Sequence, residues 1–79
     1  MKYIIIKDRD DFQFSIVFPD SVIHKDVARI HRATDIRVVS AGFCSLGSPV
    51  SVWGRSESID KDSRPLDAKI IDKDFNEQL

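Results

Sequence analysis

Apolar and polar residues alternate along the first part of the chain as they do in two paired strands. A β-branched run covers residues 3–7, and a polar break covers residues 8–11. An apolar side chain then recurs at every second position, which is typical of a strand with one buried face. These side chains are Phe12, Phe14, Ile16 and Phe18. The pattern predicts a β-hairpin whose second strand faces the core with all four of them.

The period then changes to that of a helix. Pro19 removes a backbone donor and ends the second strand, after which Asp20 or Ser21 can cap a helix. Apolar residues follow at the i, i+4 and i+7 spacing of one helical face. They are Ile23, Val27 and Ile30.

Two further strands and a closing helix fit the second half of the chain. Residues 36–43 have the composition of a third strand and residues 50–54 that of a fourth, with a loop rich in Gly, Ser and Pro between them. In the polar break that follows, Ser63 can cap a helix and Pro65 can occupy its first turn. The closing helix is expected over residues 64–74.

The resulting order of elements is ββαββα, without an internal repeat, a linker or a low-complexity tract. Hairpins joined by a helix most simply give a four-stranded, mainly antiparallel sheet with its helices on one face. We therefore expect a small two-layer α+β domain that spans residues 1–79. The pattern leaves the order of the strands open.

The third and fourth strands carry apolar side chains on both faces. Ile36 and Val38 share one face, as do Val50 and Val52, and these residues can meet the helices. The side chains of the other face are apolar and aromatic, whereas a sheet face in contact with water carries polar side chains. Its side chains are Tyr3, Ile5, Val39, Ala41, Phe43 and Trp53.

A contiguous apolar surface that contains Trp and Tyr is typical of a protein interface. The candidate interface residues are Tyr3, Ile5, Val39, Phe43 and Trp53. The alternative is that the closing helix, a terminal segment or a more strongly curled sheet covers this face.

Composition and net charge limit the classes of function that we expect for this chain. The chain has 79 residues, of which 42% are hydrophobic and 32% charged, and this balance is that of a globular domain. Twelve Lys and Arg against thirteen Asp and Glu give a net charge of −1. No field of the whole protein therefore steers it toward nucleic acid or an anionic membrane.

The single cysteine, Cys44, cannot form an internal disulfide, which fits a reducing cytoplasm. The opening segment lacks the long apolar stretch of a signal peptide, and no segment is apolar over the length of a membrane span. We therefore expect a cytoplasmic protein without a membrane partner.

The residue types used in catalysis and metal binding form no recognisable site. Cys44 with His24 and His31 would supply a thiol and a base, or metal ligands, but nothing in the pattern brings the three together. The close Cys and His pairs of structural zinc sites are missing. Residues 42–48 lack the lysine of a phosphate loop, and the acidic turn at residues 8–11 lacks the spacing of a calcium loop. We predict no enzyme activity, no catalytic residue, no metal and no cofactor.

One cationic cluster suggests an alternative function. Lys25, Arg29 and Arg32 form a stripe on the first predicted helix, and Arg37 follows on the next strand. Such a stripe can contact the phosphates of a nucleic acid. It also lies opposite the apolar face of the helix, where any amphipathic helix carries its solvated charges. Nucleic acid therefore ranks second to protein as the expected partner.

Several segments, in this order and at about this spacing, resemble a pattern of small proteins encoded in phages and prophages. They are FPDSVIHKDVAR, VVSAGF, WGRSES and SRPLDAKI, and they cover most of the chain. The resemblance implies a small accessory protein inside a bacterial host cell and assigns no catalytic or binding residue. Together with the apolar face, it favours a non-enzymatic module that binds a host or phage protein, or a second copy of itself.

Overall fold

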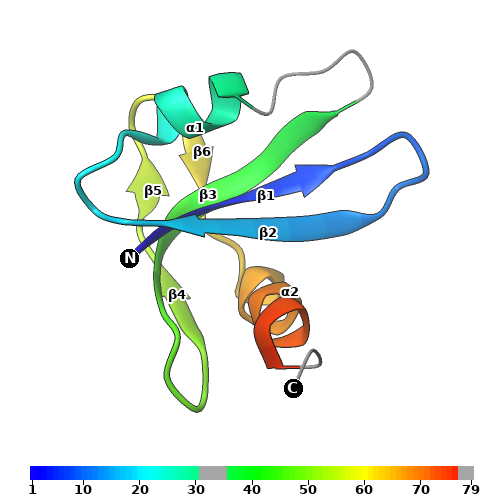
Figure 1. Ribbon diagram of the computed structural model, residues 1–79, viewed down its shortest axis with the longest axis vertical. Coiled ribbons are helices and arrows are strands. Elements are labelled where there is room, and N and C mark those ends of the chain that lie inside the picture. Colours follow the sequence, from blue (N-terminus) through cyan, green and yellow to red (C-terminus); the bar gives the residue numbers. More distant parts are fainter. Residues whose placement is uncertain (31–35, 77–79) are drawn as a thin grey trace.

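The computed structural model describes residues 1–30 and 36–76. Four strands form one antiparallel sheet in the order β2-β1-β3-β4, and two short strands form a separate hairpin (Figure 1). The predicted α+β class and the four-stranded antiparallel sheet are confirmed. In chain order the elements are β1 (Lys2–Lys7), β2 (Gln13–Phe18), α1 (His24–Ile30), β3 (Arg37–Ser45), β4 (Ser51–Trp53), β5 (Arg55–Ser56), β6 (Lys61–Asp62) and α2 (Pro65–Asn76).

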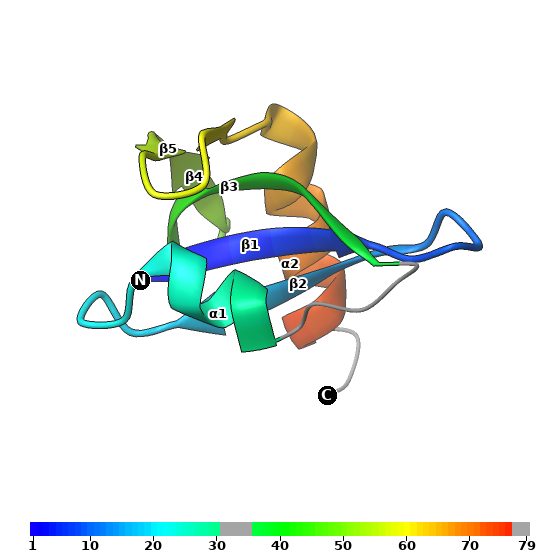
Figure 2. The same cartoon turned by 90° about the horizontal axis from the view of Figure 1, so that it is seen from above.

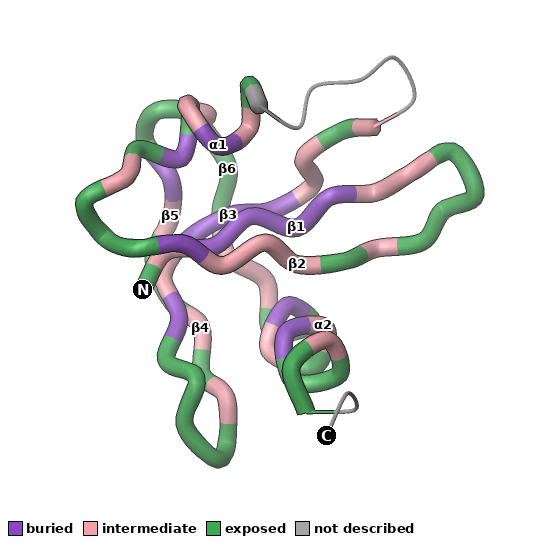
Figure 3. The backbone as a smooth tube through the Cα atoms, viewed as in Figure 1, coloured by how far each residue is buried: buried purple, intermediate pink, exposed green. Residues whose placement is uncertain are grey.

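The strand β1 lies in the centre of the sheet and is buried along most of its length (Figure 3). It pairs with β2 on one side and with β3 on the other. Because successive side chains of a strand point to opposite faces, the apolar run from Tyr3 to Ile6 supplies core residues to both faces of the sheet. Other elements must therefore cover both faces of the sheet to keep these side chains away from water.

The two helices cover opposite faces of the sheet. Val27 of α1 packs with Ile4 and Ile6 on one face, and Ile71 of α2 packs with Ile5 on the other. Figure 2 shows the sheet between the two helices. The expected placement of both helices on one face, in two layers, is therefore corrected. The physical reason is that the central strand is apolar on both sides, which a single helical layer cannot cover.

A bulge in β3 changes which of its side chains share a face. Ser40 and Val38 pair with consecutive residues of β1, so Val39 is an extra residue in the strand. A bulge of this kind inverts the alternation beyond it. Val38 and Ala41 accordingly belong to the cluster beneath α1, whereas Val39 packs beneath α2, together with Val52 of β4. The prediction that Val39 and Ala41 share a face is therefore wrong.

The strand β2 contributes to the core with its second half. Phe18 is buried and Ile16 packs against the same cluster, as predicted. Phe12 precedes the strand and is 69% exposed, and Phe14 is 37% exposed. The prediction that all four side chains face the helices is wrong for these two, because the tip of the β1–β2 hairpin projects beyond both helices (Figure 1).

The first helix begins later than its apolar pattern suggests. Ile23 precedes α1 and is 52% exposed, whereas Val27 is buried as predicted. The side chain of Ile30 lies outside the described residues. One apolar residue of the predicted helical face is thus shown to anchor α1 to the sheet.

Candidate functional site

A row of rings leads from the core to the surface on the α1 side of the sheet. The ring of His24 lies edge-on to the ring of Phe18 at 5.3 Å and to that of Phe43 at 5.8 Å between centroids. Phe43 in turn stacks on Trp53, with centroids 6.4 Å apart and planes at 19°. Exposure rises from 6% at Phe18 to 50% at Trp53. Packed neighbours thus hold an indole ring of which half meets solvent.

The pairing of β3 with β4 brings the two outer rings together. Phe43 and Trp53 are cross-strand partners, so their side chains lie on the same face. Gly42 lets the two strands approach, since a Cβ there would lie 2.7 Å from the carbonyl oxygen of Trp53. Gly54 ends β4 with a φ of 76°, in the left-handed region that favours glycine. These two glycines give the rings their fixed backbone positions.

His24 joins the row of rings to the backbone of β3. Its side chain is buried, and Nε2 donates a hydrogen bond to the carbonyl oxygen of Gly42 over 2.8 Å, because a carbonyl only accepts. Burial lowers the pKa of His24 below its ordinary value of 6.5, and the charge of Lys2 acts in the same direction against the opposing effect of the hydrogen bond. The folded state therefore favours the neutral imidazole.

We expect the free energy of unfolding to fall as the pH is lowered through 6.5, the ordinary pKa of histidine, toward the lower folded-state pKa of His24. In that window the unfolded chain binds more protons than the folded chain, so stability rises with pH and is lost on acidification. Urea unfolding at a series of pH values measures the slope, and His24→Gln, which keeps an N–H donor without titrating, should flatten it. Equal slopes in the two proteins would contradict this assignment.

The structure separates the five candidate interface residues. Tyr3 and Ile5 are fully buried beneath α2, and Val39 packs partly buried in the same cluster. The prediction that these residues lie on an exposed sheet face is therefore wrong, because the closing helix covers that face. Phe43 and Trp53 lie on the other face, beside α1, and remain together near the surface.

A buried carboxylate that the sequence did not single out as a site lies at the start of α2. Asp67 is fully buried and accepts a hydrogen bond from the Tyr3 hydroxyl at 2.6 Å and from the Ser40 hydroxyl at 2.9 Å. Arg64 donates to the same carboxylate from its backbone N–H and from Nε, each at 2.9 Å. The bonds from Tyr3 and Ser40 attach the first turn of α2 to β1 and β3, and the two bonds from Arg64 hold the start of the helix.

This network has a structural role. Burial, followed by the hydrogen bond to Asp67, raises the pKa of Tyr3, so its hydroxyl stays protonated and remains a donor. The signal in the sequence is an acidic residue three positions after Arg64, the spacing at which a side chain reaches back to the first N–H of a helix. Ser63, the predicted cap, instead donates its hydroxyl proton to the carbonyl oxygen of Gly54 over 2.8 Å.

Cys44 lies in a position that suppresses thiol chemistry. It is buried in the cluster beneath α2, and burial raises the pKa of its thiol. Reactive cysteines have a lowered pKa and some access to solvent. His24 packs among the rings on the α1 side, and His31 lies outside the described residues. Within the part of the chain that the structure describes, Cys44 thus has no histidine beside it.

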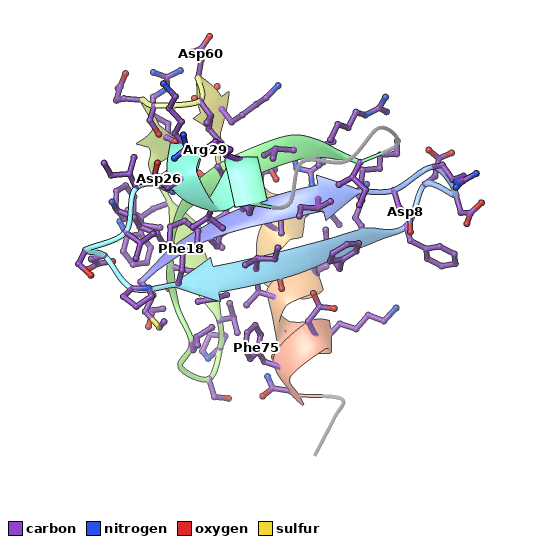
Figure 4. The ribbon with its side chains drawn as sticks, turned by 45° about the horizontal axis from the view of Figure 1, so that its top comes forward. Asp8, Phe18, Asp26, Arg29, Asp60 and Phe75 are labelled. Carbon is purple, nitrogen blue, oxygen red and sulfur yellow. The ribbon has the colours of Figure 1, made fainter. Side chains whose placement is uncertain are left out.

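Three of the four predicted cations surround one groove. Lys25 and Arg29 of α1 and Arg37 of β3 line a hollow of about 310 Å³, and Arg32 lies outside the described residues. The remaining lining residues are apolar, and they are Ile6, Ala28, Ile36, Val38 and Ile59. Figure 4 shows Arg29 and its neighbour Asp26 on α1, close to the β5–β6 hairpin. We call this hollow the cationic groove.

Within the described residues, no three His, Cys, Asp or Glu side chains gather closely enough to hold a metal ion. Across residues 1–30 and 36–76, neither helix has both the length and the apolar character that crossing a membrane requires. Comparison of the chain with family models, curated proteins and solved structures finds no match.

Proposed function

We propose that the protein is a non-enzymatic binding module that docks a partner protein through the stacked rings of Phe43 and Trp53. The observation that carries the proposal is the half-exposed indole of Trp53, held by a row of rings that begins in the core. Tryptophan is enriched among residues that dominate binding energy, and a side chain held in place loses little entropy when a partner covers it. The resemblance to phage and prophage proteins makes a host or phage protein, or a second copy of the chain, the proposed partner.

The position of the two rings supports docking from the side of the sheet. β4 is an edge strand, so a partner can reach Trp53 without displacing another strand of the sheet. Phe12 offers a useful contrast, since it is more exposed, at 69%, but makes no stacking contact with another ring of the described residues. Single exposed apolar residues are common on protein surfaces and need no partner.

We expect Trp53→Ala to weaken binding of the partner by about 4- to 13-fold, because full burial of a large aromatic side chain is worth about 1.5–3 kcal/mol and a partner can cover only the exposed half of Trp53. Tagged protein is mixed with bacterial lysate, and the retained proteins are quantified by mass spectrometry. Phe12→Ala is the matched control, because it removes an exposed aromatic ring from the other end of the sheet and should retain the same proteins.

Sedimentation distinguishes a second copy from a different protein. If the chain binds itself, its sedimentation coefficient rises with concentration, and the emission of Trp53 shifts to shorter wavelength as the indole leaves water. Trp53→Ala should then stay monomeric. A wild-type monomer at high concentration, combined with lysate partners that Trp53→Ala retains in full, would refute the proposed function.

The observation that favours a second candidate, association with nucleic acid, is the convergence of Lys25, Arg29 and Arg37 on one groove. Three cations neutralise few phosphates, so such binding would be weak and would fall steeply with salt. The groove between the cations is apolar, and a phosphate backbone has no group that would fill it. Protein binding therefore remains the first candidate.

A further inference from the structure

The cationic groove combines an apolar floor with a rim of positive charge. Five apolar residues from four parts of the chain form the floor, and the three cations belong to the surface of α1 and the start of β3. Among the described residues, Lys25 and Arg37 have no ion-pair partner. Their side chains are exposed and thus available to an anionic ligand.

Two described carboxylates, those of Asp26 and Asp60, lie near the groove in the chain and leave most of this charge uncompensated. Asp26 accepts one hydrogen bond from Nη2 of Arg29 at 3.0 Å, and a guanidinium has further donors. Asp60 follows the lining residue Ile59 along the chain, but its carboxylate is bonded to Arg55. Among the residues that the structure describes, the rim therefore carries a net positive charge around an apolar hollow.

We propose that the cationic groove binds a peptide segment of a partner protein in which a large apolar side chain is flanked by carboxylates. A volume of about 310 Å³ accommodates an apolar side chain of this kind. Lys25 and Arg29, four residues apart, project from the same side of α1, and Arg37 comes from a second element, β3. Carboxylates on both sides of the inserted side chain would each meet a cation.

A peptide fits this groove better than a free small molecule or a nucleic acid does. Small-molecule sites enclose about 70–90% of their ligand, whereas this groove is open and its rim is exposed, with Arg29 at 68%. A nucleic acid would use the cations and leave the apolar floor uncovered. The charge and the floor together are complementary to an acidic peptide with an apolar anchor.

The groove uses none of the residues of the Phe43–Trp53 pair, so this inference goes beyond the proposed function and is tested separately from it. The probe is the blocked peptide EDLFDE, titrated into isotope-labelled protein and followed by backbone amide shifts. We expect the shifts to map to the amides of the groove, and the affinity to weaken as salt rises. The peptides EDSGDE, without the anchor, and KKLFKK, with reversed charge, should bind more weakly.

The triple variant Lys25→Ala, Arg29→Ala and Arg37→Ala should lower the affinity for EDLFDE about tenfold, since an exposed ion pair is worth about 0.2–1 kcal/mol. Lys69→Ala, which removes an exposed cation from α2 on the other face, is the matched control and should leave the affinity unchanged, as should Trp53→Ala. A second variant, Lys25→Glu with Arg37→Glu, should prefer KKLFKK to EDLFDE.

Three results would overturn this inference. The first is an absence of amide shifts in the groove at millimolar EDLFDE. The second is equal affinity of the wild-type protein and the triple variant for this peptide. The third is a short DNA duplex that binds the groove more tightly than EDLFDE at physiological salt, which would assign the three cations to nucleic acid.

Discussion

Asp67→Ala is expected to lower the free energy of unfolding by about 3–5 kcal/mol, the cost of removing one member of a buried charged network. The carboxylate is fully buried and accepts four hydrogen bonds. Its loss leaves the hydroxyls of Tyr3 and Ser40 buried without their acceptor, and each such orphaned group costs about 1–3 kcal/mol. Urea unfolding monitored by circular dichroism measures the change.

Two further variants test the origin of this loss. Asp72→Ala removes an exposed carboxylate from the same helix and should change stability by no more than about 0.5 kcal/mol. Tyr3→Phe removes one donor and leaves the other three bonds of Asp67 in place, so it should cost less than Asp67→Ala. A loss below about 1 kcal/mol for Asp67→Ala would mean that water replaces the network.

Ile71→Ala is expected to destabilise the protein by about 2–5 kcal/mol, as truncation of a buried aliphatic side chain does. Ile71 is fully buried and packs with Tyr3 and Ile5 on the face that α2 covers. Its removal creates a cavity between the helix and the central strand, which neighbouring side chains fill only in part. The same unfolding experiment gives the free energy.

The control for Ile71 lies on the same helix. Leu66 is 47% exposed, so Leu66→Ala should cost much less than Ile71→Ala although it removes a side chain of the same size. Equal losses, or a small loss for Ile71→Ala, would show that α2 does not seal the sheet. The face with Tyr3 and Ile5 would then become a candidate for partner binding again.

The period of the sequence predicted the elements better than it predicted their faces. The two hairpins, the helix after Pro19 and the closing helix with Pro65 in its first turn all follow from local patterns, because strands and helices depend on neighbours in the chain. The face of the sheet on which a side chain lies depends on the register in which the strands pair. One extra residue, Val39, inverts the alternation of side chains between the two faces of β3. No local sequence pattern predicts such a bulge.

The candidate sites were predictable to the extent that they are local. The pairing of Phe43 with Trp53 follows from the hairpin, and the common side of Lys25 and Arg29 follows from the helical period. The row of rings and the floor of the cationic groove join residues from separate elements, so their existence depends on the tertiary fold. Asp67 illustrates the same limit, since its partner Tyr3 is 64 positions away in the sequence.

The cover of β1 by α2 also sets the order in which the chain can fold during synthesis. The central strand β1 precedes the other described elements in the chain, and α2 follows them. Until Asp67 and Ile71 emerge, Tyr3 and Ile5 can find neither their acceptor nor their apolar neighbour. Contacts between such distant residues carry a large loop-closure entropy and slow folding. The face of β1 that carries Tyr3 and Ile5 therefore lacks its cover until synthesis has passed Ile71.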